Sequence, residues 1–500
     1  DMTKFLTGAT LAKQYWWNRH YDPYKYPIYT NTDDIDSFIR KSYYGGRVEI
    51  SQLGLVEKKL YYLDYTSLYP ATGCYDLPFG EPEYINFNNS SILPDSFFGY
   101  VKCLVKTKCD KRRPLHGDKS LNKLCFRIHE KWEEMTLFSE EVRYGVKIDM
   151  YDYQFIEGYN QKRGPIMKQV FEECFEKKAT AKAEGKPAMA QAWKIILNSL
   201  YGFWGLRTKD RDSVKIYPKG DSPVFDYLQR GKLINESDIG NYTILRVLND
   251  LDIKDFNVGI ASAIASYGRI RLTNLIHDIE DKNYKVYMND TDSIITDCNI
   301  SKYPDLMENY MWDGCGDELG SLKNEADEKI QKVIKGKETD YLSTELAIVY
   351  EYSDNETKDK LNRLALSEIA KKEDGLIHFD RGIFCGCKFY SLEKVFNGIN
   401  IDITKCKGYK QNSKDTLTFA DIQELTINTK PTNENDFGYF DMYNNHLEQN
   451  QMQFRIPKCN MLSESDAFKY TIPSINKTFK QTYTKGYVDS SGAVKPLINK

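Results

Sequence analysis

The sequence has no long hydrophobic run. None of its apolar stretches reaches the roughly 18 consecutive residues that a transmembrane helix needs, and no secretory signal opens the chain. Regular cysteine spacing is also absent, because the 11 cysteines are an odd number scattered along the chain, which argues against a disulfide framework. We therefore expect an intracellular protein with reduced thiols and no membrane partner, in the cytoplasm, the nucleus or an organelle.

A strong net charge is absent as well. The 69 Lys and Arg residues and 72 Asp and Glu residues give a formal net charge of −3. Charge is nevertheless separated along the chain: residues 381–500 carry 16 basic and 12 acidic residues, whereas residues 301–375 carry 11 and 18. The basic C-terminal part suits contact with a polyanion, and we expect the acidic stretch to face away from that polyanion.

Three acidic residues stand at the ends of predicted strands. Asp64 follows residues 60–63, an aromatic and apolar run rich in strand formers. Asp290 and Asp292 lie between residues 286–288 and 293–296, which indicate two strands joined by a turn. Carboxylates suit Mg²⁺, and two such ions roughly 3.5–4 Å apart can catalyse phosphoryl transfer. Either acidic segment alone is also typical of a solvated turn. A third segment distinguishes a metal-binding group from solvated turns.

That third segment is a predicted helix. Lys194, Asn198 and Tyr201 are spaced i, i+4 and i+7 and therefore share one helical face. Gly185 and Pro187 punctuate the chain so that residues 165–184 and 187–201 indicate an antiparallel helical hairpin. Four lysines near its tip form either a solvated face or a cationic finger directed at a triphosphate: Lys177, Lys178, Lys182 and Lys186.

Together the three segments resemble motifs A, B and C of family B DNA polymerases, in the same order along the chain. The matching residues are Asp64-x-x-Ser67-Leu68-Tyr69-Pro70, Lys194-x3-Asn198-Ser199-x-Tyr201-Gly202 and Asp290-Thr291-Asp292-Ser293. Three further segments resemble motifs of the protein-primed branch, which occurs in phages, linear plasmids and Maverick-type elements. They are Tyr43-Tyr44-Gly45-Gly46, Lys388-Phe389-Tyr390 and Lys405-Cys406-Lys407-Gly408. The resemblance spans roughly residues 40–410.

The resemblance implies a template-directed DNA polymerase that adds deoxynucleotides to a primer 3′-hydroxyl. Asp64, Asp292 and the backbone carbonyl of Tyr65 would hold two Mg²⁺ ions, for which Mn²⁺ can substitute, and Asp290 would assist. The deoxynucleoside triphosphate would contact Ser67, Leu68, Tyr69, Lys182, Lys194, Asn198 and Tyr201. The Tyr69 ring would lie under the sugar and exclude a ribose 2′-hydroxyl. The template-primer DNA would contact Tyr43, Gly45, Gly46, Thr291, Lys388, Tyr390, Lys405 and Lys407.

One position departs from the family pattern. The family usually places Tyr two residues before the first Asp of motif C, whereas this chain has Met288 there and Tyr287 one place earlier. A shift of one residue in a strand moves the ring to the opposite face, although a flexible Met can fill an apolar slot. We expect weaker packing at the primer terminus rather than inactivity.

The implied fold is α+β, of the right-hand polymerase type: a palm with an antiparallel sheet, helical-hairpin fingers, a thumb and two insertion subdomains. In the protein-primed branch the first insertion engages the priming (terminal) protein. Because only 42 residues precede Tyr43, we expect the chain as given not to proofread. The expected segments are 1–42 (a linker or remnant from the exonuclease side), 43–83 (palm, motif A), 84–150 (first insertion), 151–164 (palm), 165–203 (fingers, motif B), 204–250 (second insertion), 251–325 (palm, motif C), 326–375 (an extra palm insertion), 376–404 (palm, Lys-x-Tyr) and 405–500 (thumb and C-terminal segment).

The extra insertion has no counterpart among the motifs. Its charge and the helical spacing of Leu361, Leu364, Leu366 and Ile369 predict an exposed amphipathic helix attached to the palm, which is either a partner contact or a surface embellishment.

Two alternative functions remain at this point. One is a polymerase that uses RNA substrates or templates, and the other is a polymerase-like DNA-binding scaffold without catalysis. The Tyr69 ring argues against ribonucleotides, and the complete set of acids argues against a scaffold.

Overall fold

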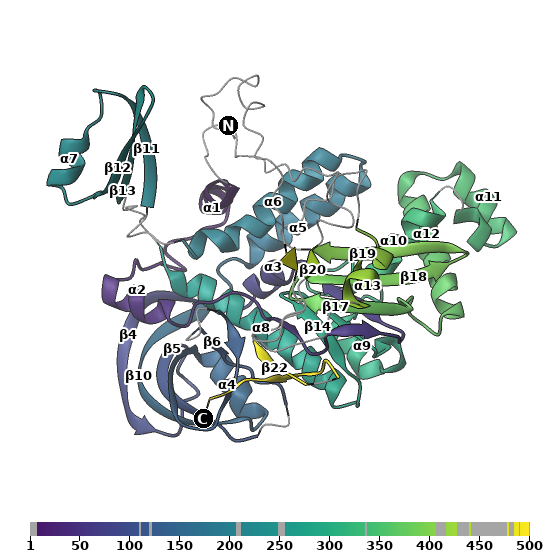
Figure 1. Ribbon diagram of the computed structural model, residues 1–500, viewed down its shortest axis with the longest axis horizontal. Coiled ribbons are helices and arrows are strands. Elements are labelled where there is room, and N and C mark those ends of the chain that lie inside the picture. Colours follow the sequence, from purple (N-terminus) through teal and green to yellow (C-terminus); the bar gives the residue numbers. More distant parts are fainter. Residues whose placement is uncertain are drawn as a thin grey trace.

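The computed structural model mixes helices with largely antiparallel sheets (Figure 1). It describes residues 8–109, 112–119, 123–206, 212–248, 256–335, 338–406, 417–427, 440–441, 478–479, 485–489 and 491–499. Lys407 and most of the expected thumb lie outside the described residues. Within the described part of the chain, every helix is too short or too polar to cross a lipid bilayer.

A central antiparallel sheet of five strands carries the predicted acids. Its strands are built from β-branched, aromatic and aliphatic residues and are buried on both faces. Tyr61, Leu63 and Tyr65 alternate with Tyr62, so they face the long helix α8 (Val258–Glu280), while Tyr62 faces a second sheet. The strand order is β1 (Val48–Ile50), β14 (Val286–Asp290), β15 (Ser293–Thr296), β3 (Tyr61–Tyr65) and β16 (Leu322–Asn324).

Helix α8 lies against the central sheet, and most of its residues are buried. Asn257 caps its first turn, since the Asn257 side chain accepts a hydrogen bond from the Gly259 N–H at 2.8 Å. Small buried residues such as Ala261, Ala263 and Ala265 let neighbouring elements approach the helix closely. Helix α9 (Pro304–Tyr310) covers the same face of the central sheet through Leu306.

The second sheet packs on the other face of the central sheet. Its strands, in order, are β19 (Ile399–Cys406), β18 (Phe389–Phe396), β17 (Arg381–Gly386) and β2 (Gly54–Val56). Helix α10 (Glu325–Ile334) joins this core through Ala326, Ile330 and Ile334. Helices α11 (Thr344–Tyr352) and α12 (Asn355–Lys372) extend outward at the right of Figure 1.

The amphipathic helix predicted in the extra insertion is α12, but its buried stripe differs from the predicted one. Leu361, Ala365 and Ile369 are buried at i, i+4 and i+8, whereas Leu364 is 37% exposed. The stripe follows the i+4 ridge, because that ridge is the one that meets α10 and the second sheet.

Two helices form the predicted hairpin, α5 (Lys168–Ala183) and α6 (Pro187–Trp204), joined by a turn in which Gly185 has φ +68°. Helix α1 (Gly8–Arg19) packs on α6, with the rings of Trp16 and Trp204 5.5 Å apart. Short helices α2 (Asp33–Arg40) and α3 (Leu68–Gly73) pack against α8. Helix α2 begins in an acidic run, with Asp33, Asp34 and Asp36 in its first turn.

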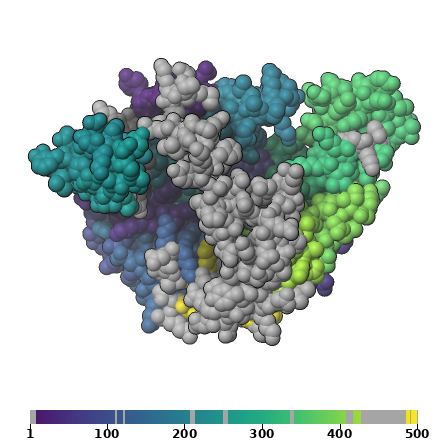
Figure 2. All heavy atoms as spheres, turned by 45° about the horizontal axis from the view of Figure 1, so that its top comes forward, coloured from purple at the N-terminus to yellow at the C-terminus, as the bar shows by residue number. Residues whose placement is uncertain are grey.

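Two further sheets lie toward the left in Figure 1. One has the order β4 (Leu77–Ser90), β10 (Tyr151–Gly164), β5 (Gly99–Thr107) and β9 (Glu133–Phe138), covered by α4 (Ser139–Lys147). The other, β11 (Asp212–Pro218), β13 (Tyr242–Leu248) and β12 (Leu233–Ile239) with α7 (Val224–Gln229), forms the protrusion at the left edge of Figure 2.

Shorter elements complete the described part. Near the C-terminus, β24 (Ile498–Asn499) pairs in parallel with β8 (Ile128–His129), and the Leu53 N–H donates to the Gly492 carbonyl at 2.7 Å. The end of the chain therefore returns to segments that precede α5. The remaining short elements are β6 (Gly117–Asp118), β7 (Cys125–Phe126), α13 (Phe419–Ile427), β20 (Phe440–Asp441), β21 (Thr478–Phe479), β22 (Gly486–Val488), β23 (Val494–Pro496), and the 3₁₀ turns η2 (Ile300–Lys302) and η3 (Glu338–Tyr341).

Candidate active site

The structure brings the three predicted acids to one edge of the central sheet. Strands β3 and β15 pair directly, with Ser293 opposite Asp64, and the Tyr65 N–H donates to the Asp292 carbonyl at 2.7 Å. Asp290 ends β14 opposite the same Ser293. The two acidic segments, far apart in sequence, are therefore adjacent in the fold.

The acids disfavour one another's ionisation. Burial and the negative charge of Asp292 raise the pKa of Asp64 to about 8, and burial together with Asp290 raises the pKa of Asp292 to about 6. Oδ1 of Asp64 is buried and has no hydrogen-bond partner among the described residues. A hard divalent cation would relieve both conditions, whereas in the described part of the chain no three His, Cys, Asp or Glu side chains gather closely enough to form a metal site by themselves.

A lysine and a further acid, which belong to none of the sequence motifs, lie beside Asp64. Lys323 is opposite Asp64 in β16, with its Nζ 4.0 Å from Asp64 Oδ2 and 2.5 Å from Glu325 Oε1. Strand β16 has only three residues and matches none of the motifs, so only its pairing with β3 reveals these neighbours.

The turn between β14 and β15 is held by the segment that follows the Tyr-Gly-Gly motif. Thr291 has φ 64°, and its N–H donates to the Arg47 carbonyl at 2.8 Å. The Asn289 side chain donates to the same carbonyl at 3.0 Å. A Cβ on Gly46 would lie 2.6 Å from Thr291 Cγ2 and 2.9 Å from Tyr69 Oη. Glycine is thus the residue that permits this close approach.

Three tyrosines from different motifs meet beside the acids. The rings of Tyr69 and Tyr201 stack with centroids 4.5 Å apart, and Tyr43 meets Tyr201 edge-on at 6.5 Å. Burial raises the pKa of Tyr69 to about 12, so its hydroxyl stays protonated at neutral pH. Ser67, in a left-handed conformation with φ 58°, precedes α3, and Leu68 is buried in its first turn.

The hairpin places a group of cations close to this edge. Lys194 and Asn198 are exposed on α6, and Lys182 is exposed on α5. Burial and the positive charges of Lys194, Lys182 and Lys323 lower the pKa of Lys178 to about 8. Of the four tip lysines, Lys178 therefore joins Lys182 in the cluster. The other two are engaged in ion pairs, Lys177 with Glu173 and Lys186 with Glu184.

The Lys-x-Tyr segment reaches the acids from the second sheet. Lys388 Nζ lies 3.1 Å from Asp290 Oδ1. Tyr390 is only 3% exposed, and its hydroxyl donates to the Tyr62 hydroxyl at 3.0 Å, so its contacts here are within the protein. Lys405 is exposed on β19, opposite Tyr390 in the ladder.

The strand before Asp290 contains a bulge. The register between β14 and β15 shifts between Val286 and Met288, so Tyr287 and Met288 both enter the core between the two sheets. Tyr287 stacks on Phe384 with centroids 6.0 Å apart. The prediction that the two side chains occupy opposite faces assumed regular alternation, which the bulge interrupts. The expected effect on the primer terminus stays a prediction.

Comparison with known proteins supplies the family. The model of the family "DNA polymerase type B, organellar and viral" matches residues 1–293. The chain belongs to this family of DNA polymerases. It is 26% identical over 467 residues to a probable DNA polymerase of Podospora anserina, which covers 87% of this chain and 36% of that protein. It is also 28% identical over 282 residues to a probable DNA polymerase of Neurospora intermedia, covering 54% and 28%. The chain thus spans about a third of the length of these curated relatives.

Solved structures confirm the expected fold. Phi29 DNA polymerase complexed with primer-template DNA and incoming nucleotide substrates matches with a TM-score of 0.54 at 16% identity, covering 83% of this chain and 62% of that one. An orthorhombic crystal form of the same polymerase matches with a TM-score of 0.54, covering 83% and 63%. The α+β right-hand polymerase fold is therefore correct, while the expected segment boundaries stay predictions.

Proposed function

We propose that this type B polymerase chain is a template-directed, DNA-dependent DNA polymerase that adds deoxynucleotides to a primer 3′-hydroxyl. The observation that carries the proposal is the meeting of Asp64, Asp290 and Asp292 at one sheet edge. Asp64, Asp292 and the Tyr65 carbonyl are the proposed ligands of two Mg²⁺ ions, with Asp290 assisting. When bound, such ions stabilise the charge on the attacking and leaving oxygens of phosphoryl transfer.

The nucleotide would lie between the acids and the helical hairpin. Lys194 and Lys182, with Lys178 beside them, would offset the negative charge of the triphosphate. The stacked ring of Tyr69 would lie under the sugar and exclude a 2′-hydroxyl, while Asn198 and Tyr201 pack against the new base pair. Ser67 and Leu68 complete the proposed nucleotide contacts at the start of α3.

The DNA would approach along the side formed by the Tyr-Gly-Gly and Lys-x-Tyr segments. Lys388, beside Asp290, would contact a phosphate near the primer terminus. The other proposed DNA contacts are Tyr43, Gly45, Gly46, Thr291, Tyr390, Lys405 and Lys407.

We further propose a role in protein-primed replication of a viral or mobile-element genome. A terminal protein would contact residues 84–150, and a nucleotide covalently linked to a co-purified protein would support this role.

Asp292→Asn tests the catalytic assignment. The amide removes one negative charge at the proposed ion site, so we expect primer extension with Mg²⁺ to fall by roughly a thousandfold or more, whereas binding of primer-template DNA is retained. Asp305→Asn is the matched control, because Asp305 is a surface acid paired with Lys282, and it should extend normally. Wild-type protein should use deoxynucleotides in preference to ribonucleotides.

Two results would contradict the assignment. Substantial extension by the Asp292→Asn protein would overturn the role of that residue. Wild-type protein that binds DNA but does not extend a primer with Mg²⁺ would favour the non-catalytic scaffold instead.

A further inference from the structure

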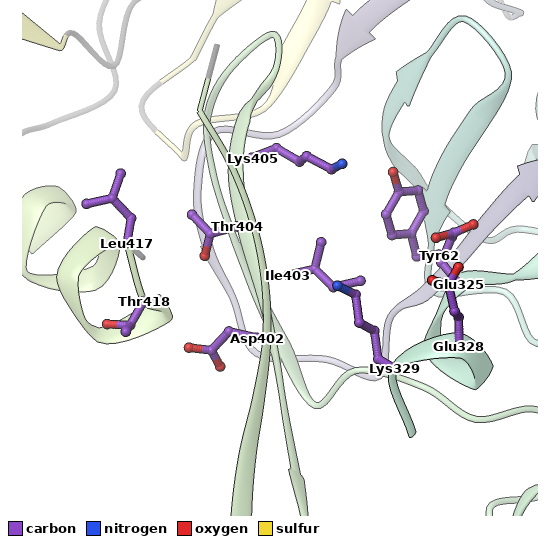
Figure 3. A pocket seen from close by; sticks show the side chains of 10 residues that line it. All are labelled: Tyr62, Glu325, Glu328, Lys329, Asp402, Ile403, Thr404, Lys405, Leu417 and Thr418. Carbon is purple, nitrogen blue, oxygen red and sulfur yellow. The ribbon is translucent and has the colours of Figure 1, made fainter. Parts of the chain in front are cut away.

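A polar cavity of about 460 Å³ lies between β3, α10 and β19. Figure 3 shows how its side chains are arranged. Ile403 and Lys405 point from β19 toward Tyr62 and the side chains of α10, whereas Asp402 and Thr404 point from the other side of the strand. Lys405 and Lys329 therefore belong to the part of the cavity that faces Tyr62.

Two cations in this part of the cavity lack an acidic partner among the described residues, whereas its two α10 acids have cationic neighbours. Glu325 lies 2.5 Å from Lys323, which also lies 4.0 Å from Asp64, and Glu328 lies 2.8 Å from Lys332. Within the described residues, neither Lys329 nor Lys405 forms an ion pair. A group that neutralises both lysines must be anionic, and the polar surroundings suit a hydrated one such as a phosphate.

Two wall residues of the cavity contact residues of the candidate active site. Glu325, on its wall, shares Lys323 with Asp64. Tyr62, also on its wall, accepts the hydrogen bond of Tyr390. A strand whose reacting hydroxyl reaches the acids would therefore pass this cavity on leaving the sheet edge.

Lys329 is held in place by a rigid element. Helix α10 is anchored in the core by Ala326, Ile330 and Ile334, each 1% exposed. The helix belongs to the segment 326–375, which the family motifs leave without a role. Although residues 301–375 are acidic overall, α10 places Lys329, which has no ion-pair partner in the described part of the chain, on this side of the helix.

We propose that Lys329 and Lys405 form a phosphate-binding site for the primer strand upstream of its terminus, and that α10 forms one wall of the DNA groove. The site rests on the proposed polymerase function, because that function requires a strand to start at the acids. In this proposal the extra insertion contributes to DNA binding.

The first test compares Lys329→Gln with Lys335→Gln in binding of primer-template DNA. Lys335 lies at the C-terminal end of α10 and does not line the cavity. Each variant removes one positive charge, so the two differ only in the position of the lost charge. One lost phosphate contact should weaken binding by roughly fivefold at 0.15 M salt and reduce the slope of log K against log salt by about 1. Lys329→Arg should restore binding, and Lys335→Gln should match wild type.

A second test identifies the strand. Each phosphate of the primer or the template is replaced in turn by a neutral methylphosphonate. We expect one upstream primer phosphate whose replacement weakens binding by wild type but not by Lys329→Gln. The proposal is overturned if Lys329→Gln binds like Lys335→Gln, or if the coupled phosphate lies on the template. These outcomes are separate from a failure of the polymerase function, which wild-type primer extension in the same preparations reports.

Discussion

At the scale of single residues, Gly46 is required by close contact. Its backbone has no unusual φ angle, yet a Cβ there would lie 2.6 Å from Thr291 Cγ2 and 3.0 Å from the Thr291 Cα. Gly46→Ala should push the β14–β15 turn away and displace Asp290 and Asp292. A displacement of about 1 Å can lower a rate by about a hundredfold, so we expect the rate of primer extension to fall by roughly tenfold to a hundredfold. Steady-state primer extension measures it.

Gly386→Ala is the matched control. A Cβ at Gly386 would meet no atom within 4 Å, so this variant should extend primers as wild type does. Equal activity of the two variants would show that the turn tolerates the added methyl group, and would remove Gly46 from the site.

The candidate site was predictable at those residues whose motif and local structure coincide. Asp64, Asp290 and Asp292 end strands or occupy a turn, so the sequence indicated both their geometry and their grouping. Lys323 and Glu325 were not predictable, because they reach Asp64 only through the pairing of β16 with β3. Sequence spacing carries no information about such long-range pairing.

At the scale of elements, α10 carries a half-buried acid whose ionisation opposes folding. Asn324 caps the helix, and its side-chain amide donates to Asp327 Oδ1 at 2.7 Å. Burial raises the pKa of Asp327 to about 7, above its unfolded value of about 3.9. The folded state therefore binds the proton more tightly, so this contribution to stability is complete below pH 4 and is lost as pH rises toward 7.

Asp327→Asn should remove this pH dependence. The amide oxygen can still accept from Asn324, and no charge has to be buried. Relative to wild type, the variant should gain about 1–3 kcal/mol in free energy of unfolding between pH 4 and pH 8. Thermal melting at a series of pH values measures the gain. Asp359→Asn, at an exposed position of α12, is the control, and a parallel pH profile for both variants would contradict the assignment.

At the scale of the whole molecule, one guanidinium joins three distant parts of the chain. Arg269 of α8 and Glu141 of α4 form an ion pair at 2.8 Å with both side chains fully buried. Arg269 also donates to the Tyr44 carbonyl at 2.6 Å and to the Gly45 carbonyl at 3.2 Å. The helices themselves were predictable or locally encoded, but this junction depends on how the first insertion packs on α8, so spacing along the chain could not predict it.

Substitutions of Glu141 and Arg269 should affect the stability and the activity of the protein differently. Glu141→Gln leaves the Arg269 charge buried without its partner, so we expect the free energy of unfolding to fall by about 3–5 kcal/mol. Adding Arg269→Met removes that charge and should recover most of the loss, as measured by denaturant unfolding. Primer extension by the Glu141→Gln/Arg269→Met double variant should stay below the wild-type rate. In that variant the Tyr44 and Gly45 carbonyls lose the donor that holds the segment next to Thr291. Recovery of activity together with stability would show that the guanidinium serves packing alone and leaves the Tyr-Gly-Gly segment to position itself.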